Sequence, residues 1–392
     1  MTGVILTLNA GSSSIKFALY GAGQEPALEA SGMIDAIGPD ARLILKPEAA
    51  APSVTPLGQT DHRTGVRAIL TALRPLLADR PVLGMGHRIV HGGPDIDGPR
   101  VLDTNLLTYL AGLEPLAPLH QPHNLAAVHA ARDAFPGAVQ VGAFDTAFHR
   151  GHPRVNDIFA LPRRYYDQGL RRYGFHGLSY EYISGVLARD YPDLACGKVI
   201  VAHLGNGASL TGIEAGRSIS STMGFSALEG LCMGTRPGQV DPGVLLYLMK
   251  EEGMGYTDLT RLLYKESGML GLSGISHDMR ELLASDAPEA AEAIAYYCTR
   301  LAREIGAMAA VLGGLDALVF TGGVGENAHP IRARALESLG FLGLTLDPQA
   351  NATNARQIGA GPIPVLVLPT DEERVIARAT NSLLPASHSN DP

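Results

Sequence analysis

The chain has 392 residues, 46% of them hydrophobic and 18% charged, which is enough for two globular domains. Its net charge of −8 and its lack of a basic block argue against nucleic acid or an anionic membrane as a partner, because binding to phosphate backbones needs clustered cations. The three cysteines lack Cys-x-x-Cys spacing, and the N-terminus has no basic segment followed by an apolar stretch. We therefore expect a cytoplasmic protein with reduced thiols and no membrane span.

The N-terminal residues predict a β-hairpin with a polar tip. Residues 4–8 form an apolar run bounded by turn residues, and residues 15–20 alternate apolar and polar side chains. The tip, residues 9–14, contains an asparagine and three serines and is followed by Lys16. Its backbone N–H groups, hydroxyls and ammonium group suit the terminal phosphates of a nucleotide. The sequence is not that of a P-loop, and an ordinary Gly/Ser turn is the alternative interpretation.

The chain after the hairpin predicts further strand, a loop and two helices. Residues 27–45 are compatible with strand, and residues 47–60, rich in Pro and Ala, predict a loop. Residues 66–77 place apolar side chains at helical spacing. A Pro-punctuated loop with His120 and His123 precedes the second helix. These histidines do not follow the His-Glu-x-x-His pattern, so they do not predict a metal site.

Two charged side chains are predicted at the ends of buried strands. A short apolar strand within residues 81–90 carries Arg88, whose guanidinium is costly to bury unless an anionic ligand or a carboxylate pairs with it. An anion site and a structural salt bridge are both open interpretations. Asp145 follows the strand 138–144, at the carboxyl edge where open α/β sheets place their chemistry.

A histidine and a second arginine stand out in the middle of the chain. His176 follows an aromatic residue between Gly174 and Gly177, a setting that an exposed basic face does not explain, and its ring could donate to an anion. Residues 216–243 form a long irregular segment whose apolar content predicts an ordered functional loop. Arg236, flanked by turn residues in that segment, is a second candidate cation for an anion site.

The opening pattern is repeated about halfway along the chain. Residues 198–212 again predict a strand, a Gly/Asn/Ser turn and a strand. Val4-Ile5 matches Val199-Ile200 and Ser14-Ile15 matches Ser209-Leu210, both 195 residues further on. A constant offset near half of the chain length predicts two copies of one βββαβα-type unit.

The last third of the chain predicts a long helix over residues 288–312 and a strand over 316–321 that enters the glycine-rich segment 322–325. Glycines between a strand and a helix let a flat or charged ligand approach the backbone. We expect the next helix to begin with Asn327 as its N-cap and to run to about residue 339. A Thr-Asp-Glu-Glu cap predicts one more helix near the C-terminus.

Seven segments of the chain, taken together and in order, resemble the acetate kinase family of the acetate and sugar kinase, heat-shock chaperone and actin superfamily. They are Asn9-Ala10-Gly11-Ser12-Ser13-Ser14-Ile15-Lys16-Phe17, Gly86-His87-Arg88-Ile89-Val90-His91-Gly92-Gly93, Phe144-Asp145-Thr146-Ala147-Phe148-His149, Arg172-Tyr173-Gly174-Phe175-His176-Gly177, His203-Leu204-Gly205-Asn206-Gly207, Met233-Gly234-Thr235-Arg236 and Gly322-Gly323-Val324-Gly325-Glu326-Asn327. The resemblance covers essentially the whole chain. It implies an α/β fold of two duplicated ribonuclease-H-like (actin-like ATPase) domains, with mixed sheets flanked by helices and a ligand cleft between the domains.

The resemblance also implies a reaction. It is the reversible, Mg-assisted, in-line transfer of the γ-phosphoryl group of ATP to acetate, which gives acetyl phosphate and ADP. Mg²⁺ or Mn²⁺ is the implied metal, and acetate, ATP and a second copy of the chain are the implied partners. The implied domains are residues 1–147 with 371–392, and a nucleotide-binding domain of residues 148–370.

Positions that match the family's functional residues are carried over one by one. The catalytic positions are Arg88, Asp145, His176 and Arg236. The substrate-binding positions are Arg88, Val90, Leu119, His120, Phe175 and Ala227. The nucleotide positions are Ser12, Lys16, His203, Leu204, Gly205, Asn206, Gly207, Asp278, Met279, Arg280, Gly323, Val324, Gly325, Glu326 and Asn327. The metal positions are Asn9 and Glu372, and Glu373 is an alternative to Glu372 because the chain has Asp371-Glu372-Glu373 where the family usually has Asn-Glu-Glu.

The chemistry of this reaction supports a cationic site. A carboxylic acid with a pKa of about 4 to 5 is already ionised at neutral pH, so its phosphorylation needs no general base. The obstacle is the repulsion between the carboxylate and the phosphoryl group, which cations around the in-line path reduce. We therefore expect Asp145 to orient a cation or the metal rather than to act as a base.

Alternative interpretations stay open on the sequence alone. Ser226-Ala227 stands where the family usually has Thr-Pro, and a smaller residue there would widen the acyl pocket, so a propionate kinase is the closest alternative. A non-kinase actin-like ATPase is the second. The physiological direction of the reaction is open. The family implies direct transfer, but the residues alone do not exclude a phospho-enzyme.

Overall fold

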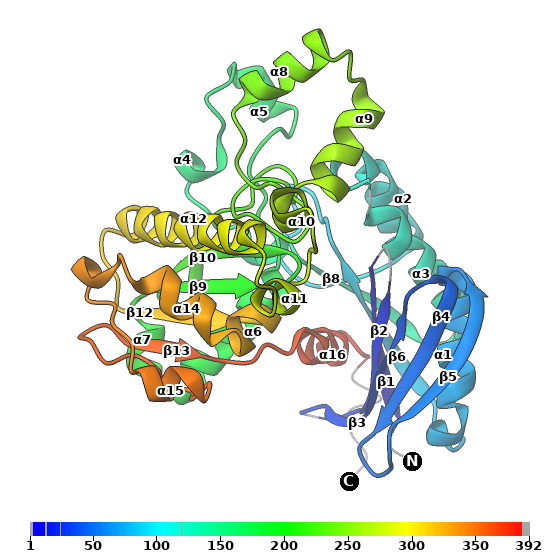
Figure 1. Ribbon diagram of the computed structural model, residues 1–392. Coiled ribbons are helices and arrows are strands. Elements are labelled where there is room, and N and C mark those ends of the chain that lie inside the picture. Colours follow the sequence, from blue (N-terminus) through cyan, green and yellow to red (C-terminus); the bar gives the residue numbers. More distant parts are fainter. Residues whose placement is uncertain (1–2, 12–13, 24, 119, 386–392) are drawn as a thin grey trace. The chain divides into compact units, whose positions relative to one another are not determined.

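The computed structural model describes residues 3–11, 14–23, 25–118 and 120–385 (Figure 1). The chain divides into two compact units, residues 1–150 with 371–392 and residues 151–370. Each unit is built around one mixed β-sheet with helices packed against it. The predicted α/β class with two mixed sheets is confirmed.

The sheet of the first unit has eight strands in the order β5-β4-β3-β2-β1-β6-β8-β7. β1 to β5 pair antiparallel, whereas β1 with β6 and β6 with β8 pair in parallel. The strands are β1 Val4–Ala10, β2 Ile15–Gly21, β3 Ala27–Asp35, β4 Gly38–Pro47, β5 Ser53–Thr60, β6 Val82–Ile89, β7 Arg100–Val101 and β8 Val139–Phe144. The helices are α1 His62–Leu77, α2 Thr104–Gly112, η1 Glu114–Leu116, α3 Gln121–Ala134, η2 Ala147–His149 and α16 Glu372–Ser382.

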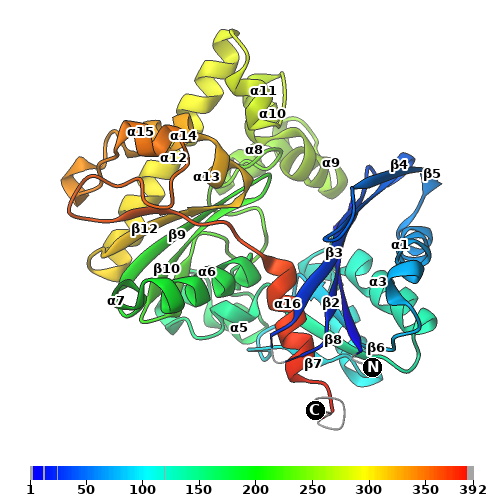
Figure 2. The same ribbon diagram turned by 90° about the horizontal axis from the view of Figure 1, so that it is seen from below.

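β1 is buried on both of its faces. Leu6 and Leu8 pack in one cluster with apolar residues of α1 and α3, whereas Ile5 packs with Tyr20 and with Ala377 of α16. Figure 2 shows α16 on one side of this sheet and α1 and α3 on the other. Because side chains alternate along a strand, the last polar residue of β1, Asn9, is on the α16 side.

The sheet is unusually close to α16. An ideal Cβ on Gly84 would lie 2.7 Å from Thr380 Cγ2, and one on Gly86 would lie 2.5 Å from Ile376 Cγ2. Contacts this short leave no room for a side chain at either glycine. The helix α16 therefore packs directly against the strands β1 and β6 and forms part of the core of the first unit.

The prediction of a loop over residues 47–60 was wrong, because β5 occupies Ser53–Thr60 and pairs with β4. β5 is the edge strand of the sheet, and all of its residues except Leu57 and Thr60 are exposed. An exposed edge strand needs no alternating apolar pattern and tolerates Pro56, so its sequence looks like that of a loop.

The sheet of the second unit has five strands in the order β11-β10-β9-β12-β13. The strands are β9 Lys198–Leu204, β10 Ala208–Glu214, β11 Arg217–Ser221, β12 Ala317–Thr321 and β13 Val365–Val367. The helices are α4 Arg154–Asp157, α5 Arg163–Asp167, α6 Gly177–Asp190, α7 Pro192–Ala195, α8 Pro242–Glu251, α9 Tyr256–Arg261, the π-helix η3 Leu262–Glu266, α10 Gly268–Ser273, α11 Met279–Leu283, α12 Pro288–Leu312, α13 Gly322–Asn327, α14 His329–Leu336, η4 Gly340–Leu342 and α15 Pro348–Ala352. Figure 2 shows α6 and α12 on opposite sides of this sheet.

The predicted duplication is confirmed at the level of topology. The order β3-β2-β1-β6-β8 in the first sheet matches β11-β10-β9-β12-β13 in the second, with the same antiparallel and parallel pairings. The hairpin tips differ, because four residues separate the pair Ala10–Ile15 and three separate the pair Leu204–Ala208. The sequence offset is therefore not constant through the hairpin.

The predicted helix after the glycine-rich segment is present as α14, His329–Leu336, but its predicted bounds, Asn327 to about residue 339, and its predicted N-cap were wrong. The glycine-rich segment itself is helical, as α13, because Glu326 Oε1 accepts the N–H of Gly322 at 2.9 Å. The helix breaks at Ala328, and Pro330 opens α14, which ends at Leu336. Asn327 is not an N-cap, and its amide donates to Gly323 O within the glycine segment.

The predicted long helix is confirmed as α12, Pro288–Leu312, whose buried face follows a helical period. Within the described residues, no helix combines the length and apolarity that a membrane crossing requires. Cys196 is exposed, Cys232 and Cys298 are buried, and all three are free thiols.

Protonation of His87 is expected to destabilise the first unit. His87 is buried in β6 and donates from Nε2 to Gln140 Oε1 at 2.8 Å. Burial lowers the pKa of His87 from 6.5 to about 4, so the unfolded chain takes up a proton before the folded one as the pH falls below 6.5. Its contribution to the free energy of unfolding is complete above pH 6.5 and should fall by about 1.4 kcal/mol per pH unit down to about pH 4.

The measurement is urea denaturation of the wild type and of His87→Gln at about pH 7 and about pH 5. The variant cannot titrate at this position, so its free energy of unfolding should fall by about 2 kcal/mol less than that of the wild type over this range. Equal losses in the two proteins would contradict the assignment. His91, whose pKa burial also lowers, to about 3, titrates in both proteins and cancels in the comparison.

Candidate active site

Arg88 and Asp145 form an ion pair at the carboxyl ends of neighbouring strands of the first unit. Arg88 pairs in parallel register with Ala143, which brings Asp145, two residues further on, beside it. Arg88 Nη2 donates to Asp145 Oδ2 at 2.6 Å, and Nε donates to Oδ1 at 3.0 Å. The Asp145 side chain is 2% exposed and that of Arg88 is 21% exposed. Asp145 is thus the carboxylate that the guanidinium needs at this edge.

Two further oxygens face the same guanidinium. Arg88 Nη1 donates to Asn9 Oδ1 at 3.1 Å and lies 4.0 Å from Glu372 Oε2 at the start of α16. Burial lowers the pKa of Arg88, but Asp145 and Glu372 raise it by more, so the guanidinium stays charged. We call Asn9, Arg88, Asp145 and Glu372 the Arg88 cluster.

Glu372 and Glu373 point to different places. Glu373 lines a cavity of about 300 Å³ together with Lys16, Lys46 and Asp371, and it acts on the charge of Arg88 less strongly than Glu372 does. Burial, and then the neighbouring Glu372, raise the pKa of Glu373. Lys16 is exposed in β2, where it pairs with Asn9 across the hairpin. Of the two glutamates, Glu372 is therefore the one that belongs to the Arg88 cluster.

Two buried amides at the start of α3 fix the strand ends, and the sequence analysis missed both. Asn124 Oδ1 accepts the N–H of Val90 at 2.9 Å, and Asn124 Nδ2 donates to Ala10 O at 2.7 Å. Gln121 Nε2 donates to His91 O at 3.0 Å, and its Oε1 accepts the N–H of the same residue. The signal in the sequence was a pair of amide residues around Pro122 at a helix start, which resembles ordinary capping.

The remaining positions predicted in the first unit are distributed as follows. Val90 is buried directly after β6, and His120 immediately precedes α3. Ser12 and Leu119 lie outside the described residues. The structure therefore brings together Asn9, Arg88, Asp145 and Glu372 and leaves Lys16 on the neighbouring strand.

The second unit gathers its predicted cation and histidine at the turn between β9 and β10. Gly205 N donates to Gly207 O at 2.9 Å, which closes a tight turn. An ideal Cβ on Gly207 would lie 2.7 Å from Arg236 Nη2 and 3.1 Å from His176 Nε2. The guanidinium of Arg236 and the imidazole of His176 therefore both lie where a side chain at Gly207 would be.

Backbone and side-chain contacts fix these two groups. Arg236 Nη1 donates to Ala227 O at 2.8 Å. His176 adopts a left-handed backbone with φ of 57° directly before α6, and its Nδ1 lies 2.8 Å from Ser209 Oγ. The ring of His176 stacks on that of His203, with centroids 4.4 Å apart. Phe175, the other predicted residue of this segment, is buried.

A cavity of about 630 Å³ lies next to this turn. Its lining includes eight of the predicted nucleotide positions, which are Gly205, Asn206, Asp278, Met279, Arg280, Gly323, Val324 and Asn327. A volume of this size is typical of small-molecule and cofactor sites. Missed residues on its wall include Gly234, His277, Leu283 and Tyr297.

The other predicted nucleotide positions in this unit support the cavity or lie at its edge. Leu204 is fully buried, and Gly325 packs within ordinary contact of the β9 backbone. Glu326 binds the Gly322 and Thr370 N–H groups. At the cavity wall, Asp278 caps α11, and hydrogen bonds from Arg280 lower the pKa of Asp278 to about 2.

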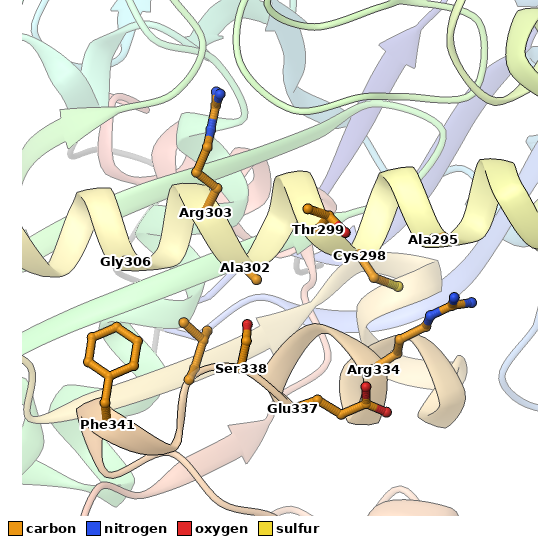
Figure 3. A pocket seen from close by; sticks show the side chains of 11 residues that line it. Ala295, Cys298, Thr299, Ala302, Arg303, Gly306, Arg334, Glu337, Ser338 and Phe341 are labelled. Carbon is orange, nitrogen blue, oxygen red and sulfur yellow. The ribbon is translucent and has the colours of Figure 1, made fainter.

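A separate cavity of about 660 Å³ lies between α12 and the segment that follows α14 (Figure 3). Cys298 and Ala302 point into it from α12, and Ser338 points into it from the opposite side. None of the positions predicted from the sequence lines it.

A buried arginine supports the glycine segment from behind, and the sequence analysis missed it. Arg332 in α14 is fully buried and donates from Nη1 to Gly325 O at 2.8 Å. It also donates to Asn351 Oδ1 at 2.8 Å and to Asn354 Oδ1 at 2.6 Å. Burial lowers the pKa of Arg332 to about 10, and no carboxylate among the described residues pairs with it. Its role is therefore to bind neutral acceptors that hold α13 in place.

Two units whose sheets share a five-strand order, and a nucleotide-sized cavity beside a glycine turn in one of them, define the actin-like ATPase fold class. The sequence profile described as the Acetokinase family matches residues 4–378, and the chain belongs to that family.

Individual relatives agree with the family profile. The chain is 50% identical to the acetate kinase of Methylocella silvestris, over 98% of each chain. It is similar to the crystal structure of acetate kinase from Porphyromonas gingivalis, with a TM-score of 0.87, 36% identity, and 98% of this chain and 100% of that one covered. It is also similar to the crystal structure of a propionate kinase from Francisella tularensis, with a TM-score of 0.92, 34% identity, and 97% of this chain and 100% of that one covered.

Removing Arg332 should destabilise the second unit strongly. In Arg332→Met the buried oxygens of Gly325, Asn351 and Asn354 lose their donor, and we expect the free energy of unfolding to fall by about 3 kcal/mol or more. Arg334→Met, an exposed position on the same helix, is the control and should change it by less than about 0.5 kcal/mol. Urea denaturation of both variants makes the comparison. Similar values for the two would show that the buried bonds do not stabilise this segment.

Proposed function

We propose that this protein is a carboxyl-group phosphotransferase that transfers the γ-phosphoryl group of ATP reversibly to acetate, giving acetyl phosphate and ADP. The relatives named acetate kinase support the reaction. The observation that carries the proposal is the convergence of Arg236 Nη2 and His176 Nε2 on Gly207, beside a cavity of about 630 Å³. A cation and a hydrogen-bond donor over a bare backbone turn suit the oxygens of a transferring phosphoryl group.

The acid is proposed to bind at the Arg88 cluster. Its carboxylate would accept hydrogen bonds from the guanidinium, which is 21% exposed and so is accessible to a small ligand. Asp145 holds Nε and Nη2 of Arg88, which fixes the plane of the guanidinium and leaves Nη1 toward Asn9 and Glu372. Asp145 is already engaged with a cation. Its proposed role is therefore to orient Arg88, since an ionised acid has no proton for a base to remove.

The nucleotide is proposed to occupy the cavity beside the glycine turn. Gly205, Gly234 and Gly323 line it without side chains, so a nucleotide would approach the backbone closely. Arg236 and His176 would then contact the terminal phosphate. Their charge and hydrogen bonds would reduce the repulsion between the entering carboxylate and the phosphoryl oxygens, which is the main obstacle in this reaction. The proposed domains, residues 1–147 with 371–392 and residues 148–370, thus bind the acid and the nucleotide respectively.

The residues of the Arg88 cluster fit a magnesium ion. Asn9 and Glu372 offer one amide oxygen and one carboxylate, the hard ligands that Mg²⁺ prefers, and few protein ligands are usual where water and phosphates complete its shell. Asp145 and Glu372 outweigh the single positive charge of Arg88. When bound, Mg²⁺ or Mn²⁺ would neutralise charge on the phosphate oxygens. Asn9 and Glu372 are its proposed ligands in this chain.

The protein is further proposed to be a cytoplasmic homodimer. Large apolar side chains are exposed on and beside α8 and α9, among them Leu246, Tyr247, Met249 and Tyr256. A solvent-facing group of this kind is typical of a surface that another protein chain covers.

The proposed activity is tested by incubating the purified protein with acetate and Mg-ATP and measuring acetyl phosphate, with the reverse reaction as a second assay. ATP hydrolysis without acyl phosphate would favour a non-kinase ATPase of the same fold. Propionate is the competing substrate, because one similar solved structure is that of a propionate kinase and because the family resemblance leads us to expect a larger residue where this chain has Ala227. We expect kcat/KM to be highest for acetate. An extra methylene changes such ratios by about 10- to 200-fold, so values for acetate, propionate and butyrate would distinguish the two enzymes.

Replacing Arg236 should impair turnover far more than binding. Arg236→Ala removes a positive charge beside the proposed transferring group, and we expect kcat to fall by about 100-fold or more. The control is Arg217→Ala, an exposed arginine at the start of β11, which should keep kcat within about twofold of the wild type. Initial rates of acetyl phosphate formation give both values. Near-normal kcat in Arg236→Ala would exclude this residue from the transition state.

A further inference from the structure

Two buried serines bind the two stacked histidines of the second unit. Ser209 Oγ lies 2.8 Å from His176 Nδ1, and Ser179 Oγ lies 2.8 Å from His203 Nδ1. Both serines are fully buried. The two imidazole rings are 4.4 Å apart and inclined by 24°. In both histidines, Nδ1 is therefore bound by the hydroxyl of a buried serine.

The opposite nitrogens of both rings face the glycine turn. His176 Nε2 lies 3.1 Å from the position of an ideal Cβ on Gly207, and His203 Nε2 lies 3.9 Å from that of an ideal Cβ on Gly205. Arg236 Nη2 lies 2.7 Å from the first of these positions. Two ring nitrogens and one guanidinium nitrogen are thus presented along one short turn.

The hydrogen of Ser179 decides the tautomer of His203. Among the described residues, the hydroxyl of Ser179 has a single hydrogen-bond partner, which is His203 Nδ1. A buried hydroxyl that donates to nothing is costly, so Ser179 donates to Nδ1. A nitrogen that accepts a hydrogen bond carries no proton, and the proton of the neutral ring is then on Nε2.

Ser209 has two partners, and Tyr180 determines to which of them it donates. Tyr180 Oη lies 2.5 Å from Ser209 Oγ in a fully buried site. Burial raises the pKa of Tyr180, so the phenol keeps its hydrogen. Its neighbours include the hydroxyls of Ser209 and Thr211 and the backbone of His203, and we assign its hydrogen to Ser209 Oγ, which lies 2.5 Å away. The hydrogen of Ser209 is then directed to His176 Nδ1, and the proton of this ring is also on Nε2.

We propose that Ser179 and Ser209 are positioning residues that fix both histidines as neutral Nε2–H donors to the oxygens of the transferring phosphoryl group. This inference rests on the proposed function. Two imidazolium rings stacked at 4.4 Å and beside Arg236 would repel one another, whereas two neutral donors add hydrogen bonds without that repulsion. The charged and titratable groups that the described contacts place beside the pair include Arg236 from the loop and Tyr180 from α6.

The tautomers are tested directly by NMR of the full-length protein labelled with ¹⁵N-histidine, with His176→Gln and His203→Gln used to assign the signals. At about pH 7.5 both rings should show a protonated Nε2 and an unprotonated Nδ1. A protonated Nδ1 on either ring would overturn the proposal for that ring. This readout does not depend on the substrate, so it stands or fails separately from the proposed reaction.

The kinetic test uses Ser209→Ala and Ser179→Ala. Partners that orient metal-ligating histidines are typically worth about 10- to 100-fold, and by analogy we expect kcat to fall by about that factor while KM for acetate stays within about twofold. The NMR spectra of these variants should show mixed tautomers. Ser218→Ala is the control, because Ser218 is also buried and lies 2.7 Å from His152 Nε2, and neither residue is among the groups nearest to the bare positions of Gly205 and Gly207.

Each outcome has a definite meaning. Unchanged kcat in Ser209→Ala and Ser179→Ala would overturn the positioning role. Equal losses in these variants and in Ser218→Ala, with the same fall in Tm, would show a general packing effect and would also overturn it. A wild-type protein that makes no acyl phosphate but has both Nε2–H tautomers would refute the proposed function and leave the tautomer assignment intact.

Discussion

The first unit depends on the pairing of one partly buried cation. The guanidinium of Arg88 is held by Asp145 from the next strand, by Asn9 from the first strand and, at 4.0 Å, by Glu372 from the last helix. A guanidinium at a sheet edge needs such partners, since its desolvation must be offset by charge and hydrogen bonds. The pairing therefore connects β1, β6, β8 and α16. It also brings oxygens from distant parts of the sequence to one place.

In the second unit, polar groups gather at a turn whose glycines carry no side chains. Gly205 and Gly207 leave the turn after β9 open, and Arg236 and His176 reach into the space that a Cβ would fill. Behind His176 the groups are neutral, because Ser209 contacts its Nδ1 and Tyr180 contacts Ser209 in turn, whereas behind the glycine segment the buried cation Arg332 binds neutral oxygens. The guanidinium of Arg236 thus lies at the bare turn, and neutral hydroxyl groups support His176 there.

The hairpins, the duplication and the groups at strand ends were predictable, because glycine-rich turns and apolar runs are local signals. The edge strand β5 was not, since exposed residues leave no alternating pattern. Asn327 was misread as a cap, because the contact of Glu326 with Gly322, which winds the glycine segment into α13, is not visible in a sequence pattern. Asn124 and Arg332 act through buried contacts with residues far along the chain or in neighbouring elements. Long-range partners of this kind follow from the fold and cannot be inferred from spacing.

The place of α16 has a consequence for biosynthesis. This helix follows the whole second unit in the sequence, yet it packs against Gly84 and Gly86 of β6 and beside β1, which are made earlier. Until the C-terminal residues have left the exit tunnel, one face of the first sheet has no cover, and Glu372 is absent from Arg88. Residues 151–370 form a continuous unit that needs no later segment, so it is able to fold while the nascent chain is still being extended. The first unit is therefore completed only after residues 151–370 have been made.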